Sequence, residues 1–220
     1  TQEILDQNQK IKEQHDKIER QRDLLNIRNR EIIDSIRYAE RIQRSILLKE
    51  DRLEKLFESH FIIIKPKDIV SGDFYWGRKI GKRIFFAIAD CTGHGVPGAF
   101  MSIIGHNLLT YALNDRKLRE PSDVLKMINQ MIRKTLNQND EEVESMKDGM
   151  DIAFFSFDTQ TRELKFAGAQ RPLIIMRDEE LLEIKGNRFP VGGALVDDQT
   201  EFEQQCITLE NDDRIYVLSY

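Results

Sequence analysis

The stretch AIADCTGHGVPGAFMS, residues 87–102, decides the fold and most of the chemistry of this chain. An apolar run ends on the acid Asp90, a turn with Gly93 and Gly95 follows, and apolar residues resume after Pro97. The first part is typical of a buried strand, and proline suits the first turn of a helix, where its missing N–H would have no partner anyway. The sequence therefore predicts a strand, a glycine turn and a helix, with one carboxylate at the rim of a sheet.

A carboxylate in that position is costly to bury unless a cation or hydrogen-bond donors meet it. Glycines in the turn let backbone groups approach an ion or a phosphate. Asp73 in SGDFYW and Asp151 before IAFFSF stand in similar settings, and such acids suit Mg²⁺ or Mn²⁺. From spacing alone, these acids could equally be turn residues that bind no metal. Spacing also leaves His94 open as a base, a metal ligand or an exposed loop residue.

After the N-terminal region the pattern predicts an α+β domain. Apolar runs at 61–64 and 83–89 indicate buried strands, helices are expected over 97–112 and from Pro121 onward, and 137–149 is expected to be a polar loop. Further strands are expected in six apolar runs: DIAFFSF (151–157), ELKFAGA (163–169), PLIIM (172–176), LLEI (181–184), QCITL (205–209) and RIYVLS (214–219).

Residues 1–59 contain neither glycine nor proline and carry apolar residues at intervals of seven: Ile4, Ile11, Ile18, Leu25, Ile32, Ala39, Ile46 and Leu53. This spacing predicts a long helix that coils around a partner. The companion core positions hold polar residues, Asn8, His15, Arg22 and Asn29, which weaken a coil but can fix its register. A lone solvated helix is the alternative. We expect a parallel homodimeric coil over 1–59 and a folded domain over 60–220.

Composition excludes several classes of protein. A net charge of -5 gives no general attraction to nucleic acid. Cys91 and Cys206 lie far apart and form no metal-ligand spacing, which favours a reducing compartment. No apolar run is long enough to span a membrane. We expect a cytoplasmic protein, with any membrane anchor or sensor lying upstream.

VSGDFYW together with IADCTGHGVPGAFMS resembles the bacterial SpoIIE-type branch of the PP2C, or PPM, serine/threonine phosphatases, which includes RsbU-like activators of stress-response sigma pathways. The resemblance covers roughly residues 45–220 and includes IQRSILL, FIIIKPKDIVSGDFYW, MDIAFFSFD and AGAQRPLII. It implies a PP2C-like β-sandwich flanked by helix pairs, preceded by a long coiled-coil helix that joins the phosphatase to an upstream sensor.

Carried onto this sequence, the resemblance implies that Asp73, Asp90 and Asp151 are metal-site carboxylates and that Cys91 contributes its backbone carbonyl. Asp148 is a near alternative to Asp151. The implied reaction uses two Mn²⁺ or Mg²⁺ ions, whose bridging water attacks phosphoserine or phosphothreonine in line without a phosphoenzyme. The implied substrate is a phosphorylated anti-sigma-factor antagonist of the STAS type.

One departure bears on activity. In the family the strand matching RIYVLS runs into an Asp-Gly pair whose acid completes the site, but Tyr220 stands there in this chain. We therefore expect the phosphatase domain to be cut short at its C-terminus. Three functions stay open: a metal-dependent protein phosphatase, a non-catalytic dimeric signalling module or inactive phosphatase fragment, and another two-metal hydrolase such as a nuclease. The absence of a basic stripe disfavours the last.

Overall fold

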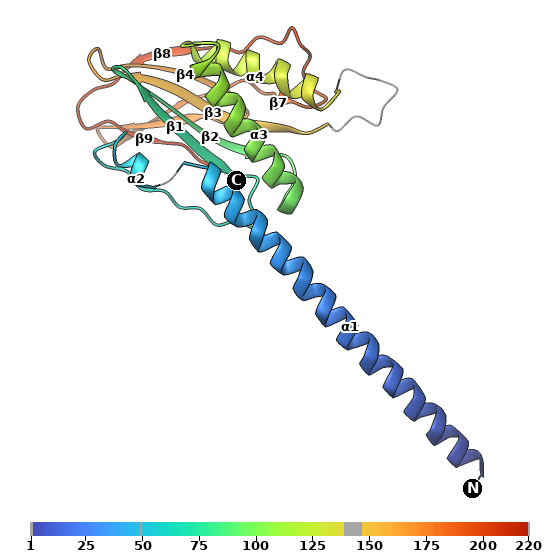
Figure 1. The fold of residues 1–220 in the computed structure, drawn as a ribbon. Helices are drawn as coiled ribbons and strands as arrows, with labels where there is room; N and C mark the ends of the chain where they lie inside the picture. Colours follow the sequence, from blue (N-terminus) through green and yellow to red (C-terminus); the bar gives the residue numbers. More distant parts are fainter. Residues whose placement is uncertain (1, 49, 139–146, 220) are drawn as a thin grey trace.

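The computed structural model describes residues 2–48, 50–138 and 147–219 (Figure 1). Its helices are α1 (Gln2–Ile46), α2 (Glu50–Leu53), α3 (Gly95–Asn114) and α4 (Pro121–Thr135). Its strands are β1 (Phe74–Ile80), β2 (Arg83–Cys91), β3 (Gly149–Asp158), β4 (Glu163–Ala169), β5 (Leu173–Arg177), β6 (Glu180–Ile184), β7 (Val191–Gly192), β8 (Gln205–Thr208) and β9 (Arg214–Tyr216). Most of the polar loop expected over 137–149, and Tyr220, lie outside the described residues.

The strands form two antiparallel sheets. The larger sheet has the order β1-β2-β3-β4-β8, with β7 also paired to β3, and the smaller has the order β6-β5-β9. Helices α3 and α4 cover one face of the larger sheet, and the smaller sheet packs on the other face. This arrangement confirms the α+β sandwich expected from the sequence.

Alternate side chains of the central strands enter two different cores. On β2, Phe85 and Ala87 pack beneath the helices, while Phe86 points toward the smaller sheet. The ring of Phe86 lies with its centroid 5.7 Å from that of Phe155 on β3. Both faces of the larger sheet are therefore buried, which explains why β2 and β3 read as continuous apolar runs.

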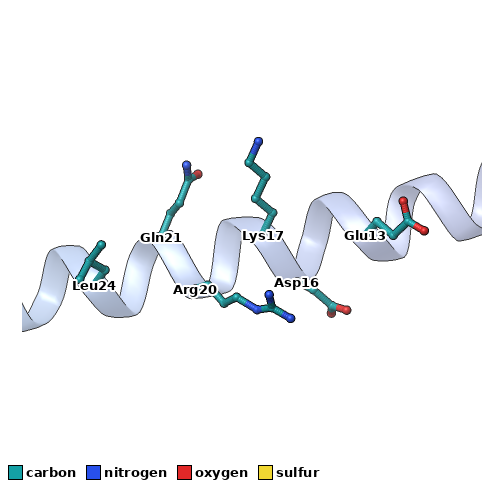
Figure 2. A pocket seen from close by; sticks show the side chains of 6 residues that line it. All are labelled: Glu13, Asp16, Lys17, Arg20, Gln21 and Leu24. Carbon is teal, nitrogen blue, oxygen red and sulfur yellow. The ribbon is translucent and has the colours of Figure 1, made fainter.

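Helix α1 extends away from the body of the protein (Figure 1). Every side chain described between residues 3 and 35 is exposed, including Ile11, Ile18 and Leu25 of the seven-residue pattern at 62%, 62% and 60%. A surface hollow lies along this helix and is lined by Glu13, Asp16, Lys17, Arg20, Gln21 and Leu24 (Figure 2). Because all six belong to one exposed helix, we assign the hollow no ligand. Among the described helices, none is long and apolar enough to cross a membrane.

The expectation of one unbroken helix through Leu53 is wrong, because α1 ends at Ile46. The chain then turns onto the body, where Leu53 is 1% exposed and the ring of Phe57 meets that of Phe86 edge-on at 5.3 Å. Leu53 belongs to the core between the two sheets. Burial of these side chains outweighs continuation of the helix, although the spacing of apolar residues continues past the break.

The buried strand expected at 61–64 is also wrong. Phe61 and Ile63 are 69% and 77% exposed, and no strand among the described residues pairs with this segment. The ring of Phe61 lies 6.3 Å from that of Tyr216 on β9. Apolar composition alone does not supply the hydrogen-bonding partner that a strand requires.

Replacing Leu53 by alanine tests the position of the helix break. We expect Leu53→Ala to lower the free energy of unfolding by about 3 kcal/mol, as is typical for truncating a fully buried leucine. Leu181→Ala is the matched control, because Leu181 on β6 is 66% exposed and its truncation should change little. Urea denaturation of the two variants measures the difference. Equal, small effects would show that Leu53 lies on an exposed helix instead.

Candidate metal centre

The pairing of β2 with β3 places Asp90 directly opposite Asp151. On the other side of β2, Phe74 of β1 pairs with Ala89, and Asp73 is the residue just before Phe74. Residues opposite each other on neighbouring strands share a face of the sheet. The three acids expected from the sequence therefore meet at one end of three adjacent strands.

Successive side chains of a strand point to opposite faces of the sheet. Asp90 lies four residues after Phe86 on β2, and Asp151 lies two residues before Ala153 on β3, so both acids share the face that packs on the smaller sheet. The side chain of Cys91 points to the other face and belongs to the core beneath the helices, where it is 4% exposed. Burial, and then the charge of Asp90, raises the pKa of the Cys91 thiol. The neutral thiol thus points away from the acids, and only the backbone carbonyl of Cys91 can serve as a ligand beside them.

Burial raises the pKa values of two of the three acids. Burial, the charge of Asp90 and a hydrogen bond to Asp90 raise the pKa of Asp73 to about 6, although Arg171 acts in the opposite direction. Burial also raises the pKa of Asp151, again against the effect of Arg171. Burial is the main cause of both shifts, and the charge of Asp90 adds to it more strongly at Asp73 than at Asp151.

Arg171 is the residue of the site that the sequence analysis did not identify. It lies between β4 and β5, is 7% exposed, and donates a hydrogen bond from Nη2 to Oδ2 of Asp90. The same Nη2 is 3.7 Å from Oδ2 of Asp151. The motif AGAQRPLII contains this arginine, but nothing local reveals its partners, because Asp90 is 81 residues away along the chain.

The glycine motifs pack backbone to backbone next to the acids. A Cβ atom on Gly98 would lie 2.5 Å from the carbonyl oxygen of Gly93 and 3.1 Å from the Cα atom of Gly72. Gly93 and Gly95 adopt positive φ angles of 83° and 66°, which favour glycine. These contacts join the loop before Asp73 to the loop after Cys91, and α3 begins at Gly95, two residues earlier than expected.

Two further residues of the sequence analysis lie at the edge of this cluster. Asp148 accepts a hydrogen bond from the Thr92 hydroxyl at 2.8 Å, and its neighbour Gly149 pairs with β7. His94 is exposed, with Nδ1 2.8 Å from Oδ2 of Asp68. Asp148 is therefore hydrogen-bonded to the turn that contains Thr92, whereas Asp151 pairs with Asp90 across the strands.

The residues present fit a divalent cation by their chemistry, since crowded carboxylates and a carbonyl are the oxygen ligands of Mg²⁺ and Mn²⁺. Across the described parts of the chain, however, no three His, Cys, Asp or Glu side chains are gathered closely enough to hold a metal ion. At Asp90 the positive charge in place is the guanidinium of Arg171.

The raised pKa of Asp73 predicts a pH dependence of stability in protein kept metal-free with EDTA. The pKa of Asp73 is about 6 in the folded protein and near 3.8 in the unfolded chain, so the folded state binds this proton more tightly. The resulting stabilisation is fully present below pH 3.8 and is lost as the pH rises through about 6. Asp73→Asn cannot ionise, so its free energy of unfolding relative to wild type should increase between about pH 4 and pH 6. Urea titrations at several pH values measure this difference. A flat difference would show that the pKa of Asp73 is ordinary.

Comparisons with known proteins agree with this architecture. The family model of stage II sporulation protein E (SpoIIE) matches residues 80–219. The SiaA-PP2C domain of Pseudomonas aeruginosa is 32% identical, with a TM-score of 0.74 over 86% of this chain and 72% of that one. No curated protein sequence matched the chain.

More distant structures share the fold. The PP2C phosphatase domain of SpoIIE from Bacillus subtilis, solved with a fragment of its regulatory domain, is 23% identical, with a TM-score of 0.51 over 66% of this chain and 40% of that one. RsbX, solved in complex with magnesium, is 12% identical, with a TM-score of 0.50 over 67% of this chain and 65% of that one. The family match, the SiaA likeness and the sandwich with its row of acids lead to one conclusion: the chain belongs to the SpoIIE family of PP2C-type, or PPM, protein phosphatases.

Proposed function

We propose that this chain removes phosphate from phosphoserine or phosphothreonine of a signalling protein, using Mn²⁺ or Mg²⁺ held at the ends of β1, β2 and β3. The observation that carries the proposal is the row of Asp73, Asp90 and Asp151 across these strands, since carboxylates gathered at one end of a sheet are the oxygen ligands that Mg²⁺ and Mn²⁺ take. RsbX, which shares the fold, was solved with magnesium.

The three carboxylates and the carbonyl of Cys91 would hold the ions. Bound divalent cations supply Lewis-acid activation of a water molecule and offset charge on the phosphoryl oxygens. The protein contributes position, because Asp90 and Asp151 are fixed by the ladder of two buried strands. The glycine turn contributes access, because Gly93 and Gly95 carry no side chain that would block a phosphate.

The substrate is proposed from the family resemblance alone: a phosphorylated anti-sigma-factor antagonist of the STAS type. A protein of net charge -5 has no general affinity for polyanions, so recognition would depend on local contacts around the phosphorylated residue. A phosphoserine peptide is therefore the simplest first substrate.

Asp90→Asn tests the metal assignment. In the full-length protein it should reduce Mn²⁺-dependent phosphate release from a phosphoserine peptide by at least about a hundredfold, because it removes the ligand between the other two acids. Asp158→Asn is the matched control: Asp158 also lies on the β2–β3 pair next to an arginine, Arg83, but at the opposite end. Its turnover should stay near wild type.

Two outcomes would contradict the proposal. Wild-type turnover by Asp90→Asn would remove Asp90 from the metal site. No phosphate release by the wild-type protein, on peptide or on phosphoprotein, would favour the alternative of a non-catalytic dimeric signalling module.

We also propose that α1 pairs with α1 of a second copy and that this pairing controls the phosphatase. Apolar residues at intervals of seven stay on one seam only if helices supercoil, and in α1 they are all exposed as far as Ile32. An acid four residues before a base also supports α1, as in Glu40 with Arg44, where Oε1 and Nη1 lie 3.6 Å apart.

Gln43 connects α1 to the loop that carries Asp73. It is 4% exposed, its Nε2 donates to the carbonyl of Ser71 at 2.6 Å and to Oγ of Ser102 at 2.8 Å, and its Oε1 accepts from the N–H of Ser71. Oγ of Ser71 in turn accepts from the N–H of Asp73 at 3.0 Å. Rotation of the end of α1 would therefore move the loop that carries Asp73.

Replacing Ile18 and Leu25 together by lysine tests the coil. The double variant should weaken dimerisation and change phosphatase activity, because it places two charges on the proposed seam. Leu24→Lys with Ile27→Lys is the matched control, since both residues are exposed on α1 but lie off the seam. Sedimentation velocity and peptide dephosphorylation measure the two effects. A monomeric wild type at tens of micromolar, or equal behaviour of the two double variants, would refute pairing through this seam.

A further inference from the structure

Arg171 is a buried cation placed within a row of candidate metal ligands. Its guanidinium donates to Oδ2 of Asp90 and lies 3.7 Å from Oδ2 of Asp151. The proposed reaction assigns it no role, and a divalent cation on these acids would need the same carboxylate oxygens.

The position of Arg171 is built into the fold. The N–H of Gln170 donates to the carbonyl of Asn187 at 2.7 Å, and the N–H of Asn187 donates back to the carbonyl of Gly168 at the same distance. Gln170 has a φ angle of 60°, and a Cβ atom on Gly186 would lie 2.7 Å from the carbonyl oxygen of Arg171. The segment 186–187 thus holds the backbone at the arginine and just before it, and the arginine side chain is buried.

We propose that Arg171 is the counter-cation of the metal-free site, and that a divalent cation must displace its guanidinium from Asp90 and Asp151 in order to bind. Like charges directly opposite on neighbouring strands repel, and the guanidinium offsets this repulsion at Asp90 and Asp151. A guanidinium and a divalent cation on the same half-buried carboxylates would repel each other, because a partly buried site screens charge less than water does. The inference rests on the proposed function, since it takes these acids as the metal ligands.

The competition sets a threshold for metal binding. When only a fraction of molecules has the site open, the apparent dissociation constant rises by the inverse of that fraction. The protein would then be folded and stable without metal. It would bind the cation only at concentrations higher than a site without the Arg171 guanidinium would need.

Mn²⁺ binding to the whole chain tests the inference, measured by calorimetry and by the electron paramagnetic resonance of free Mn²⁺. We expect Arg171→Gln to bind Mn²⁺ about tenfold more tightly than wild type and to have a lower Tm in EDTA. Arg171→Lys keeps the charge but loses the planar fork, so its affinity should fall between the two. Arg177→Gln is the control, because Arg177 also pairs with two acids, Asp213 and Glu210, on the smaller sheet. It should lose stability without any change in Mn²⁺ affinity.

The outcomes separate this inference from the metal site itself. Circular dichroism first establishes which variants are folded, and Arg171→Lys carries the test if Arg171→Gln does not fold. Wild-type binding of Mn²⁺ with equal or weaker affinity in the folded Arg171 variants would overturn the displacement and leave the metal site standing. Absence of Mn²⁺ binding from wild type and variants alike would overturn both.

Discussion

The register between β2 and β3 is the constraint on which the rest of the structure depends, because it gathers acids of neighbouring strands at one end of the larger sheet. The β2–β3 register places Asp90 and Asp151 opposite each other, and Asp73, just before β1, adds a third acid. Hydrophobic burial fixes that register, because a slip by one residue would turn every apolar side chain of β2 to the wrong core. The fold therefore holds Asp90 and Asp151 opposite each other, with the guanidinium of Arg171 beside both carboxylates.

The glycines and Gln43 extend this constraint to the rest of the molecule. Close packing of Gly72, Gly93 and Gly98 joins the loops on either side of the acids, so neither loop can move alone. Gln43 ties the last turns of α1 to the same region through Ser71 and Ser102. The end of α1 is thus joined by hydrogen bonds to the loop that carries Asp73.

The sequence predicted the helices and strands whose signals lie within the element itself. Strand β2 and helix α3 follow from an apolar run, a glycine turn and Pro97, and α4 follows from Pro121 and one apolar face. Strands β3, β4, β5, β6, β8 and β9 appear as apolar runs between turns. Strand β1 was not anticipated, because Gly77 and the charged Arg78 and Lys79 obscure its pattern, and β7 has only two residues.

The remaining features depend on contacts distant in sequence. Leu53 keeps the seven-residue spacing, yet the core between the sheets offers it more burial than a coil would. Residues 61–64 have the composition of a strand, but no strand in the described part of the chain pairs with them. The row of acids could be predicted as candidate ligands, whereas Arg171 could not, because its partners come from other strands.

Anomalous diffraction from crystals of the protein grown with Mn²⁺, collected at the manganese absorption edge, tests the central claim most directly. The account predicts an anomalous peak within bonding distance of Asp90 and of at least one of Asp73 and Asp151. Ordered carboxylates with no peak beside them at saturating Mn²⁺, or a peak bound only by other residues, would contradict it.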